Sequence, residues 1–388
     1  MAMNDIEFCG ATFDSRLVKP GMLFVALKGE KSDGHDYIPQ ALAKGAAGII
    51  DGYDELDRVA RDYRRSLKAT VVGITGSAGK TTTKELVRAF LSRAGKTHAT
   101  EGNFNNHIGL PITILNCPKD ADFLVLEMGT NHPGEIAHLC DIAEPDCGLL
   151  TNVGTAHIEF FKTQDGIAQE KGTLLARAKR FGVVSSENVR LSILRELRPA
   201  DLVEADPHAA WLADALREAL PGEHNVSNAA LAFALAERFG VTREQAVAAL
   251  ADFALPGARW RRIERNGVRF IDDTYNANPD AMIAALSTFA AQPAPGRRIA
   301  ILGDMFELGA AEDELHRKVF AHAATLGLDV VVAVGERAAR AYTAAKPASG
   351  CAFVTLAELK TAFPDLVREG DTVLLKASHS MNLGSLLA

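Results

Sequence analysis

Cysteines are few in this sequence, and none of them stands in a paired spacing. The 388 residues include five, at Cys9, Cys117, Cys140, Cys147 and Cys351. An odd number without a Cys-x-x-Cys pair argues against a disulfide framework and against a structural zinc site. We therefore expect reduced, mostly buried thiols in a cytoplasmic protein.

Long apolar runs and an excess of basic residues are also absent. No apolar run approaches the roughly 20 residues needed to span a bilayer, and residues 1–7 show no basic segment followed by an apolar core. The formal net charge is −7, which argues against binding to nucleic acid through a basic surface. We expect neither membrane insertion nor a nucleic-acid partner. No Gly-x-Ser-x-Gly motif indicates a serine nucleophile.

The composition that remains is that of an ordinary globular enzyme, with 47% hydrophobic and 23% charged residues. Runs that favour strands, at 70–74, 123–127 and 147–152, alternate with helical stretches at 81–94, 134–142 and 166–180. This alternation predicts an α/β fold with a parallel sheet. It begins again after Leu255-Pro256-Gly257, so we predict three parts: 1–68, 69–256 and 257–388.

One glycine-rich segment, Gly76-Ser77-Ala78-Gly79-Lys80-Thr81-Thr82, joins a predicted strand to a predicted helix. Backbone N–H groups at such a turn can contact phosphate oxygens, and the helix N-terminus adds partial positive charge. Lys80 would reach the β- and γ-phosphates, and the Thr81 hydroxyl would bind Mg²⁺. The spacing differs from the standard loop because Ile74 stands where the first glycine would be. An ordinary glycine-rich turn is the alternative.

Two further polar residues follow predicted strands. Glu127 ends the run 123–127, and His157 comes shortly after the run 147–152. The carboxyl ends of parallel strands form a ligand crevice, so a carboxylate there can bind the same Mg²⁺ as Thr81. Taken alone, Glu127 could face solvent, His157 could be structural, and Lys171 could be a solvated helix lysine.

Short motifs are spread over almost the whole chain. They lie at 14–16, 20–27, 33–35, 75–83, 102–106, 109–111, 127–135, 152–157, 222–228, 272–279, 302–309 and 378–382. In this order and spacing the chain resembles the Mur ligases, the ATP-dependent family that forms amide bonds in peptidoglycan synthesis. The resemblance implies a small N-terminal α/β domain for the nucleotide sugar, here abbreviated, and a central P-loop ATPase domain with a parallel sheet. It also implies a C-terminal Rossmann-like domain for the incoming dipeptide and part of ATP.

The resemblance also implies site residues. Lys80, Glu127, His157 and Lys171 would be catalytic, and Thr81, Glu127, His157 and Lys171 would hold two Mg²⁺ ions, with Lys171 often carbamylated in the family. ATP would contact the loop 76–82. Asn225 and Asn228 would lie on the adenine side, Arg259 would reach the γ-phosphate, and Asp273 would hold the ribose hydroxyls. The remaining substrate contacts would be Ser15, Arg16, Asn105, Asn106, His132, Asn276 and Asn278. Thr173 departs from the family pattern, which has Glu at that position.

The motif at 272–279 points to the dipeptide-adding branch of the family. It implies transfer of D-alanyl-D-alanine to UDP-N-acetylmuramoyl-tripeptide through an acyl phosphate, by an enzyme that we expect to be monomeric. Three alternatives stay open: a related ligase for another carboxylate or amine, a nucleotide-dependent binding or regulatory protein, and a small-molecule kinase. A lysine derivative holding a second metal ion argues against the last two.

Overall fold

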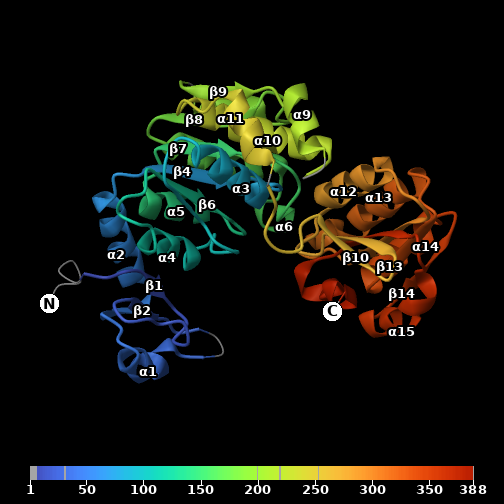
Figure 1. Cartoon of the computed structure of the whole chain (residues 1–388), viewed down its shortest axis with the longest axis horizontal. Helices are drawn as coiled ribbons and strands as arrows, with labels where there is room; N and C mark the ends of the chain where they lie inside the picture. The colour runs from blue at the N-terminus through green and yellow to red at the C-terminus, as the bar shows by residue number, and fades with distance from the viewer. Residues whose placement is uncertain (1–6, 30–31, 199, 218–219, 252, 388) are drawn as a thin grey trace. The chain divides into compact units, whose positions relative to one another are not determined.

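The computed structural model describes residues 7–29, 32–198, 200–217, 220–251 and 253–387 (Figure 1). The chain forms two compact units, 1–153 with 168–207 and 227–249, and 154–167 with 208–226 and 250–388. Two of the boundaries between them fall inside helices α7 (Gln164–Arg177) and α10 (Glu223–Glu237). The three-part division at 68/69 and 256/257 stays a prediction.

The first unit begins with a small parallel sheet of β1 (Ala11–Thr12), β2 (Leu23–Ala26) and β3 (Gly48–Asp51). Helix α1 (Ile38–Ala43) precedes β3, and α2 (Gly52–Ser66) follows it. In α2, Leu56, Val59 and Ala60 are buried at helical spacing. This face packs against α4 (Gly109–Leu115) and α5 (Glu135–Ala143).

A six-stranded sheet forms the centre of the first unit. All of its neighbouring strands are parallel. The order is β5 (Thr97–Ala99), β6 (Phe123–Glu127), β4 (Thr70–Thr75), β7 (Cys147–Leu150), β8 (Phe181–Ser185) and β9 (Leu202–Ala205). The helices between these strands include α3 (Lys80–Leu91), α7 and α8 (Leu191–Leu197), and α11 (Arg243–Leu250) follows α10. The predicted parallel α/β arrangement is confirmed.

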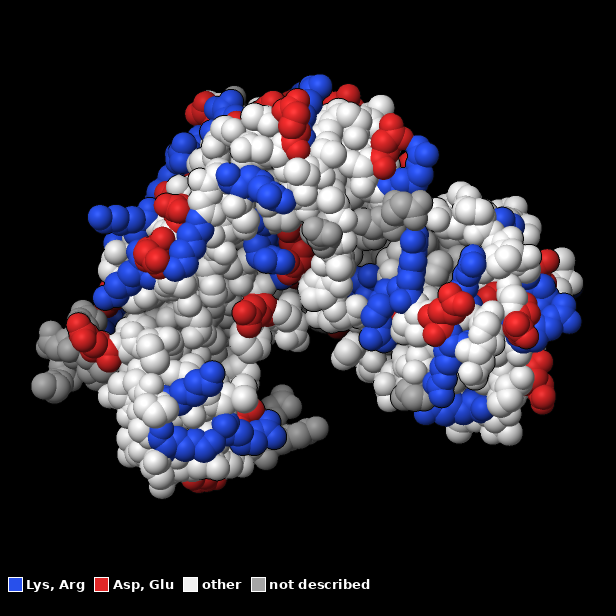
Figure 2. All heavy atoms as spheres, in the orientation of Figure 1, with Lys and Arg blue, Asp and Glu red and all other residues white. Residues whose placement is uncertain are grey.

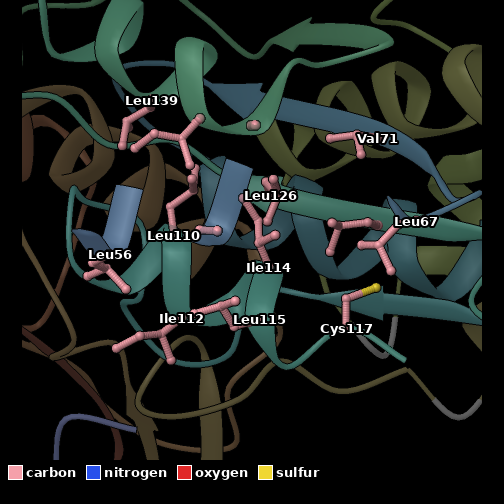
Figure 3. Packing of buried hydrophobic residues seen from close by; sticks show 14 of the residues in the cluster. Leu56, Leu67, Val71, Leu110, Ile112, Ile114, Leu115, Cys117, Leu126 and Leu139 are labelled. Atoms are coloured by element: carbon pink, nitrogen blue, oxygen red, sulfur yellow. The ribbon is translucent and has the colours of Figure 1, made fainter. Parts of the chain in front are cut away.

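A continuous apolar core joins the helices α2, α4 and α5 to strands β4 and β6. Helix α4 supplies Leu110, Ile112, Ile114 and Leu115, all nearly inaccessible to solvent. Figure 3 shows these side chains among Leu56, Leu67, Val71, Leu126 and Leu139. This packing fixes β4 and β6 from one side, and both strands lead directly into predicted site residues.

The second unit contains a mixed sheet. Its order is β10 (Arg261–Arg265), β11 (Val268–Asp272), β15 (Thr372–Lys376), β12 (Arg298–Gly303), β13 (Val330–Val334) and β14 (Gly350–Phe353). Only β10 and β11 pair antiparallel among these described strands, through a tight turn at Asn266-Gly267, where both residues have positive φ. The parallel strands are connected by helices α12 (Pro279–Ala291), α13 (Glu312–Thr325), α14 (Glu336–Ala345) and α15 (Leu356–Leu366). The second unit also contains two helices from earlier in the chain, α6 (Ile158–Phe161) and α9 (Ala210–Leu216).

The distribution of surface charge and the state of the cysteines are those of an ordinary globular protein. Figure 2 shows both signs of charge scattered over the visible face. In the described part of the chain, no helix is long and apolar enough to cross a membrane. All five cysteines are free, and Cys117, Cys140 and Cys147 are buried.

Candidate active site

The glycine-rich loop connects β4 to α3, as the sequence predicts. Helix α3 begins at Lys80, so its N-terminal dipole lies at the loop. The loop is held from the neighbouring strand end: the Ser77 N–H donates to the Asn152 carbonyl at 3.1 Å, and the Ala78 N–H donates to Asn152 Oδ1 at 3.0 Å. The Lys80 Nζ donates to the Gly76 carbonyl at 2.8 Å. The turn is therefore a preformed, cross-braced loop.

Two glycines are required by the loop's conformation. Gly76 and Gly79 have φ values of 150° and 77°, which side chains with a Cβ rarely adopt. A Cβ at Gly76 would overlap the Thr151 hydroxyl, and one at Gly79 would lie 2.6 Å from Asn228 Oδ1. Asn228, a predicted adenine-side residue, therefore lies directly against the loop.

Glu127 lies at the end of β6, paired in register with Ile74 of the loop-bearing strand. Its side chain is almost completely buried. Asn105 Nδ2 donates to Oε1 at 2.9 Å, and the Glu127 N–H donates to the Thr100 hydroxyl at 3.0 Å. Oε2 has no hydrogen-bond partner among the described residues. A buried carboxylate with one oxygen fixed and the other unpartnered is suited to bind a cation.

Lys171 is not a solvated helix lysine. It lies on α7, is completely buried, and its Nζ has no hydrogen-bond partner in the described structure. Burial, and next the nearby charge of Lys80, lower the pKa of Lys171 well below its ordinary value. The preceding residue, Glu170, accepts N–H groups of Gly134 at 2.8 Å and Ile136 at 2.9 Å, which anchors α7 to the start of α5. Lys171 is thus held in place near Lys80, where burial disfavours its charged form.

His157 belongs to the second unit. It precedes α6 with φ of 60°, and its Nδ1 lies 2.9 Å from Glu307 Oε2. This contact lowers the pKa of Glu307. No three His, Cys, Asp or Glu side chains gather at a metal position within the described ranges. The predicted metal set, which includes Thr81 and Lys171, therefore stays a prediction.

Asp273 and Arg259 lie close together in the second unit. Asp273 Oδ1 accepts the Trp260 N–H at 3.2 Å, and Oδ2 lies 2.7 Å from Lys376 Nζ. The Arg259 guanidinium stacks over the Tyr275 ring, 3.4 Å from its centre. The adjacent carboxylate, Asp272, serves the fold instead, since it accepts from Thr274 and Arg261, both at 2.7 Å.

Several predicted contact residues have visible local roles. Asn225 Nδ2 donates to the Pro221 carbonyl at 2.8 Å. Asn276 Oδ1 accepts the Ala277 N–H at 2.8 Å, and Asn278 Oδ1 accepts the Ala281 N–H at 2.9 Å as the N-cap of α12. Their predicted substrate contacts stay predictions.

The residues predicted to contact the nucleotide sugar lie in the first unit. Ser15 is buried and its hydroxyl donates to Gln40 at 2.7 Å, whereas Arg16 is exposed and paired with Asp14. Asn106 accepts the N–H groups of Ile108 and Gly109 at the start of α4. His132 is largely exposed, 3.9 Å from Glu135. Of these predicted residues, Asn105 forms a side-chain hydrogen bond with Glu127.

Sequence reasoning missed four supporting residues: Thr100, Glu170, Glu307 and Lys376. Lys376 ends an apolar strand, as Glu127 does, so the same pattern could have identified it. Glu170 adjoins Lys171 but carries no distinguishing pattern. Thr100 and Glu307 act through contacts with residues distant in sequence. Although Glu307 lies in the motif 302–309, that motif does not reveal its contact with His157.

Three family models match the chain. The model of the Mur ligase family, catalytic domain, matches residues 7–90, that of the Mur ligase middle domain matches 74–205, and that of the Mur ligase, glutamate ligase domain, matches 258–379. The chain is also 34% identical to UDP-N-acetylmuramoyl-tripeptide–D-alanyl-D-alanine ligase of Synechocystis sp., over 99% of this chain and 92% of the relative. The alignment extends over 421 positions, so the relative carries residues that this chain lacks.

The solved structures give the same result. The MurF ligase of Thermotoga maritima in complex with ADP has a TM-score of 0.83 and 28% identity, covering 99% of this chain and 97% of that one. MurF of Acinetobacter baumannii has a TM-score of 0.85 and 29% identity, covering 97% and 92%. The predicted fold class and the resemblance are confirmed: the chain belongs to the Mur ligase family.

Proposed function

We propose that this protein is the ATP-dependent ligase that joins D-alanyl-D-alanine to UDP-N-acetylmuramoyl-tripeptide. The name of the Synechocystis relative describes this reaction, and the alignment to it extends over nearly all of both chains. ADP in the Thermotoga structure supports a nucleotide site. We further propose that the protein acts as a monomer in the cytoplasm.

The reaction requires an activated carboxylate. The acceptor carboxylate attacks the γ-phosphorus of ATP, the bond to the bridging oxygen breaks, and ADP leaves. The amine of D-alanyl-D-alanine then attacks the acyl carbon, phosphate leaves with one former carboxylate oxygen, and the nitrogen loses a proton. No covalent bond to the enzyme is required, in agreement with the absence of a nucleophile motif.

The loop residues act on the phosphoryl group. Backbone N–H groups at the start of α3 orient the phosphates, and Lys80 neutralises charge as the phosphoryl group moves. The preformed loop, braced by Asn152, means that this arrangement needs little rearrangement on binding.

The residues fit a divalent cation. The unpartnered Oε2 of Glu127 and the Thr81 hydroxyl supply the oxygen ligands that Mg²⁺ prefers. When bound, Mg²⁺ would neutralise the phosphate oxygens. His157 completes the proposed ligand set, and two ions are proposed in all.

The observation that carries the proposal is the buried, unpartnered amine of Lys171 near Lys80. A neutral amine can attack carbon dioxide: the N–C bond forms, a proton leaves, and an anionic carbamate remains. The carbamate oxygens would pair with the positive charge of Lys80 and could bind a second cation. A kinase or a simple nucleotide-binding protein has no need for such a group, so Lys171 favours the ligase over those alternatives.

Phosphate release tests the proposal against its alternatives. Purified protein with ATP and Mg²⁺ should release phosphate only when both D-alanyl-D-alanine and the UDP-linked tripeptide are present. Tripeptides ending in meso-diaminopimelate and in lysine should be compared, since the sequence leaves the third residue open. Release with a different carboxylate or amine would favour a related ligase. Nucleotide binding without release under any pairing would favour a binding protein.

A further inference from the structure

Lys376 is a buried cation at the carboxyl end of β15, in the middle of the C-terminal sheet. Its side chain is 5% exposed. Its Nζ lies 2.7 Å from Asp273 Oδ2 and 3.0 Å from the Asn276 carbonyl. A buried ammonium is tolerated only when it is paired and hydrogen-bonded. Lys376 therefore binds both the carboxylate and the backbone of the loop that follows β11.

The carboxylate held by Lys376 holds a strained residue in turn. Trp260 has φ of 53°, an unusual conformation for a bulky aromatic side chain. Its N–H donates to Asp273 Oδ1 at 3.2 Å. The two oxygens of Asp273 are thus used on opposite sides, one for Lys376 and one for Trp260.

The same contacts fix the surroundings of Arg259. The Tyr275 N–H donates to the Ala258 carbonyl at 3.0 Å, and the Arg259 guanidinium stacks on the Tyr275 ring. Lys376 contacts the loop on both sides of Tyr275, at Asp273 and Asn276. Releasing Lys376 would therefore disturb Arg259 as well as Asp273.

We infer that Lys376 is a positioning residue for nucleotide binding: it sets the direction of the Asp273 carboxylate and the conformation of segment 259–260. This inference rests on the proposed ATP-dependent function and on the predicted contacts of Asp273 with the ribose and of Arg259 with the γ-phosphate. Lys376 itself need not touch the nucleotide.

A double-mutant cycle with ADP and Mg²⁺ as the probe tests the inference. The variants are Lys376→Met, Asp273→Asn and the double variant, with affinity measured by calorimetry. Each single variant should bind ADP at least about tenfold more weakly, the lower end of what is expected for loss of one hydrogen bond to a charged group. The double variant should bind ADP no more weakly than the single variant with the lower affinity, because both changes break the same Lys376–Asp273 pair.

Arg297, directly before β12, provides a matched control in the same sheet. It pairs with Asp371, directly before β15, at 2.6 Å. Arg297→Met breaks a comparable ion pair, so it should lower stability and leave ADP affinity unchanged. Lys376→Gln keeps a hydrogen-bond donor, so it should lower the affinity for ADP less than Lys376→Met does. It serves as the second variant if the methionine variant does not fold.

Tryptophan fluorescence gives a reading without nucleotide. The chain has two tryptophans, so a Trp211→Phe background leaves Trp260 as the single fluorophore. Lys376→Met or Lys376→Gln should shift its emission to the red, whereas Arg297→Met should not.

The outcomes separate this inference from the proposed function. Folded Lys376 variants that bind ADP as the wild type does, while Asp273→Asn binds weakly, would overturn the positioning role alone. Additive losses in the double variant would also overturn it. Wild-type affinity in Asp273→Asn would remove the ribose role from the proposed function, and with it this inference.

Discussion

Lys80 lies at the first position of α3, where the loop geometry directs its Nζ back to the Gly76 carbonyl. We expect Lys80→Ala to reduce turnover about 100-fold or more, because charge that develops during phosphoryl transfer loses its counter-charge. The fold should be intact, as measured by circular dichroism and thermal unfolding. Lys96→Ala, which breaks an exposed pair with Asp120, is the matched control. Near-normal turnover in folded Lys80→Ala would remove the loop from the mechanism.

Lys171 gives the second prediction at this scale. Lys171→Ala should lose most activity, because a buried anionic carbamate would be lost. A short-chain carboxylic acid should restore part of it by supplying oxygens to the vacated position. The measurement is turnover with and without the added acid, at fixed Mg²⁺.

The control for Lys171 is Lys179→Ala, an exposed lysine just after the same helix. It should be fully active and should not respond to the acid. A fully active Lys171→Ala enzyme, or an intact wild-type protein whose mass spectrum under carbon dioxide shows no carbamate, would contradict the assignment.

At the scale of single residues, the sequence predicts which side chains belong to the site better than it predicts their burial and their hydrogen-bond partners. The expectation that the carboxyl ends of parallel strands lie together placed Glu127 beside the glycine-rich loop. In the structure Glu127 pairs in register with Ile74, on the strand that leads into this loop. The burial of Lys171 was not predictable, because a lysine on a helix with weak amphipathicity can face either side. The partner of Glu127, Asn105, was predicted for another role because its contact depends on how the loop 101–108 folds back.

The loop before α4 is the first element with a testable role. Asn105 fixes one oxygen of Glu127, so Asn105→Leu should raise the Mg²⁺ concentration needed for half-maximal turnover about tenfold. Asn103→Ala, on the same loop but exposed, should leave this concentration unchanged. An unchanged Mg²⁺ requirement in folded Asn105→Leu would show that this hydrogen bond does not orient the carboxylate.

Helix α13 carries a pH-dependent contact. His316 is buried, its Nε2 accepts the Met305 N–H at 2.9 Å, and its Nδ1 lies 2.8 Å from the Glu312 carbonyl. Burial lowers the pKa of His316 below the ordinary 6.5. Below pH 6.5 the unfolded chain therefore binds a proton that the folded chain does not, and the free energy of unfolding falls as the pH decreases.

Urea unfolding at about pH 7.5 and about pH 5.5 measures this effect. The loss of stability between the two should be smaller in His316→Gln, which keeps an acceptor but does not titrate. His322→Gln, on the same helix, is the control and should keep the wild-type difference. An equal loss in wild type and His316→Gln would mean that other groups dominate the acid sensitivity.

Predictability differs between elements for physical reasons. Strands β4 and β6 were predicted within a residue because they are apolar and buried on both faces. Strand β10 was missed, since Arg261–Arg265 is charged and exposed and is a strand through its hairpin pairing with β11. Strands β8 and β9 were not predicted because the region 181–205 lacks a strong pattern.

At the scale of the whole molecule, the α/β class followed from the alternation of strand-like and helical runs, and the family followed from motifs spread over the chain. The division into units did not, since the compact units take up chain segments that are separated in sequence. Helices α7 and α10 each contain a boundary between units, and no local composition marks such a position. The predicted shortening of the first part stays a prediction.

The central claim is ligation through an acyl phosphate, and the fate of one carboxylate oxygen tests it most directly. The UDP-linked tripeptide is labelled with heavy oxygen in its acceptor carboxylate and incubated with ATP, Mg²⁺, D-alanyl-D-alanine and the enzyme. Mass spectrometry of the released phosphate should find one labelled oxygen for each amide bond formed. Unlabelled phosphate released alongside the amide product would contradict the account.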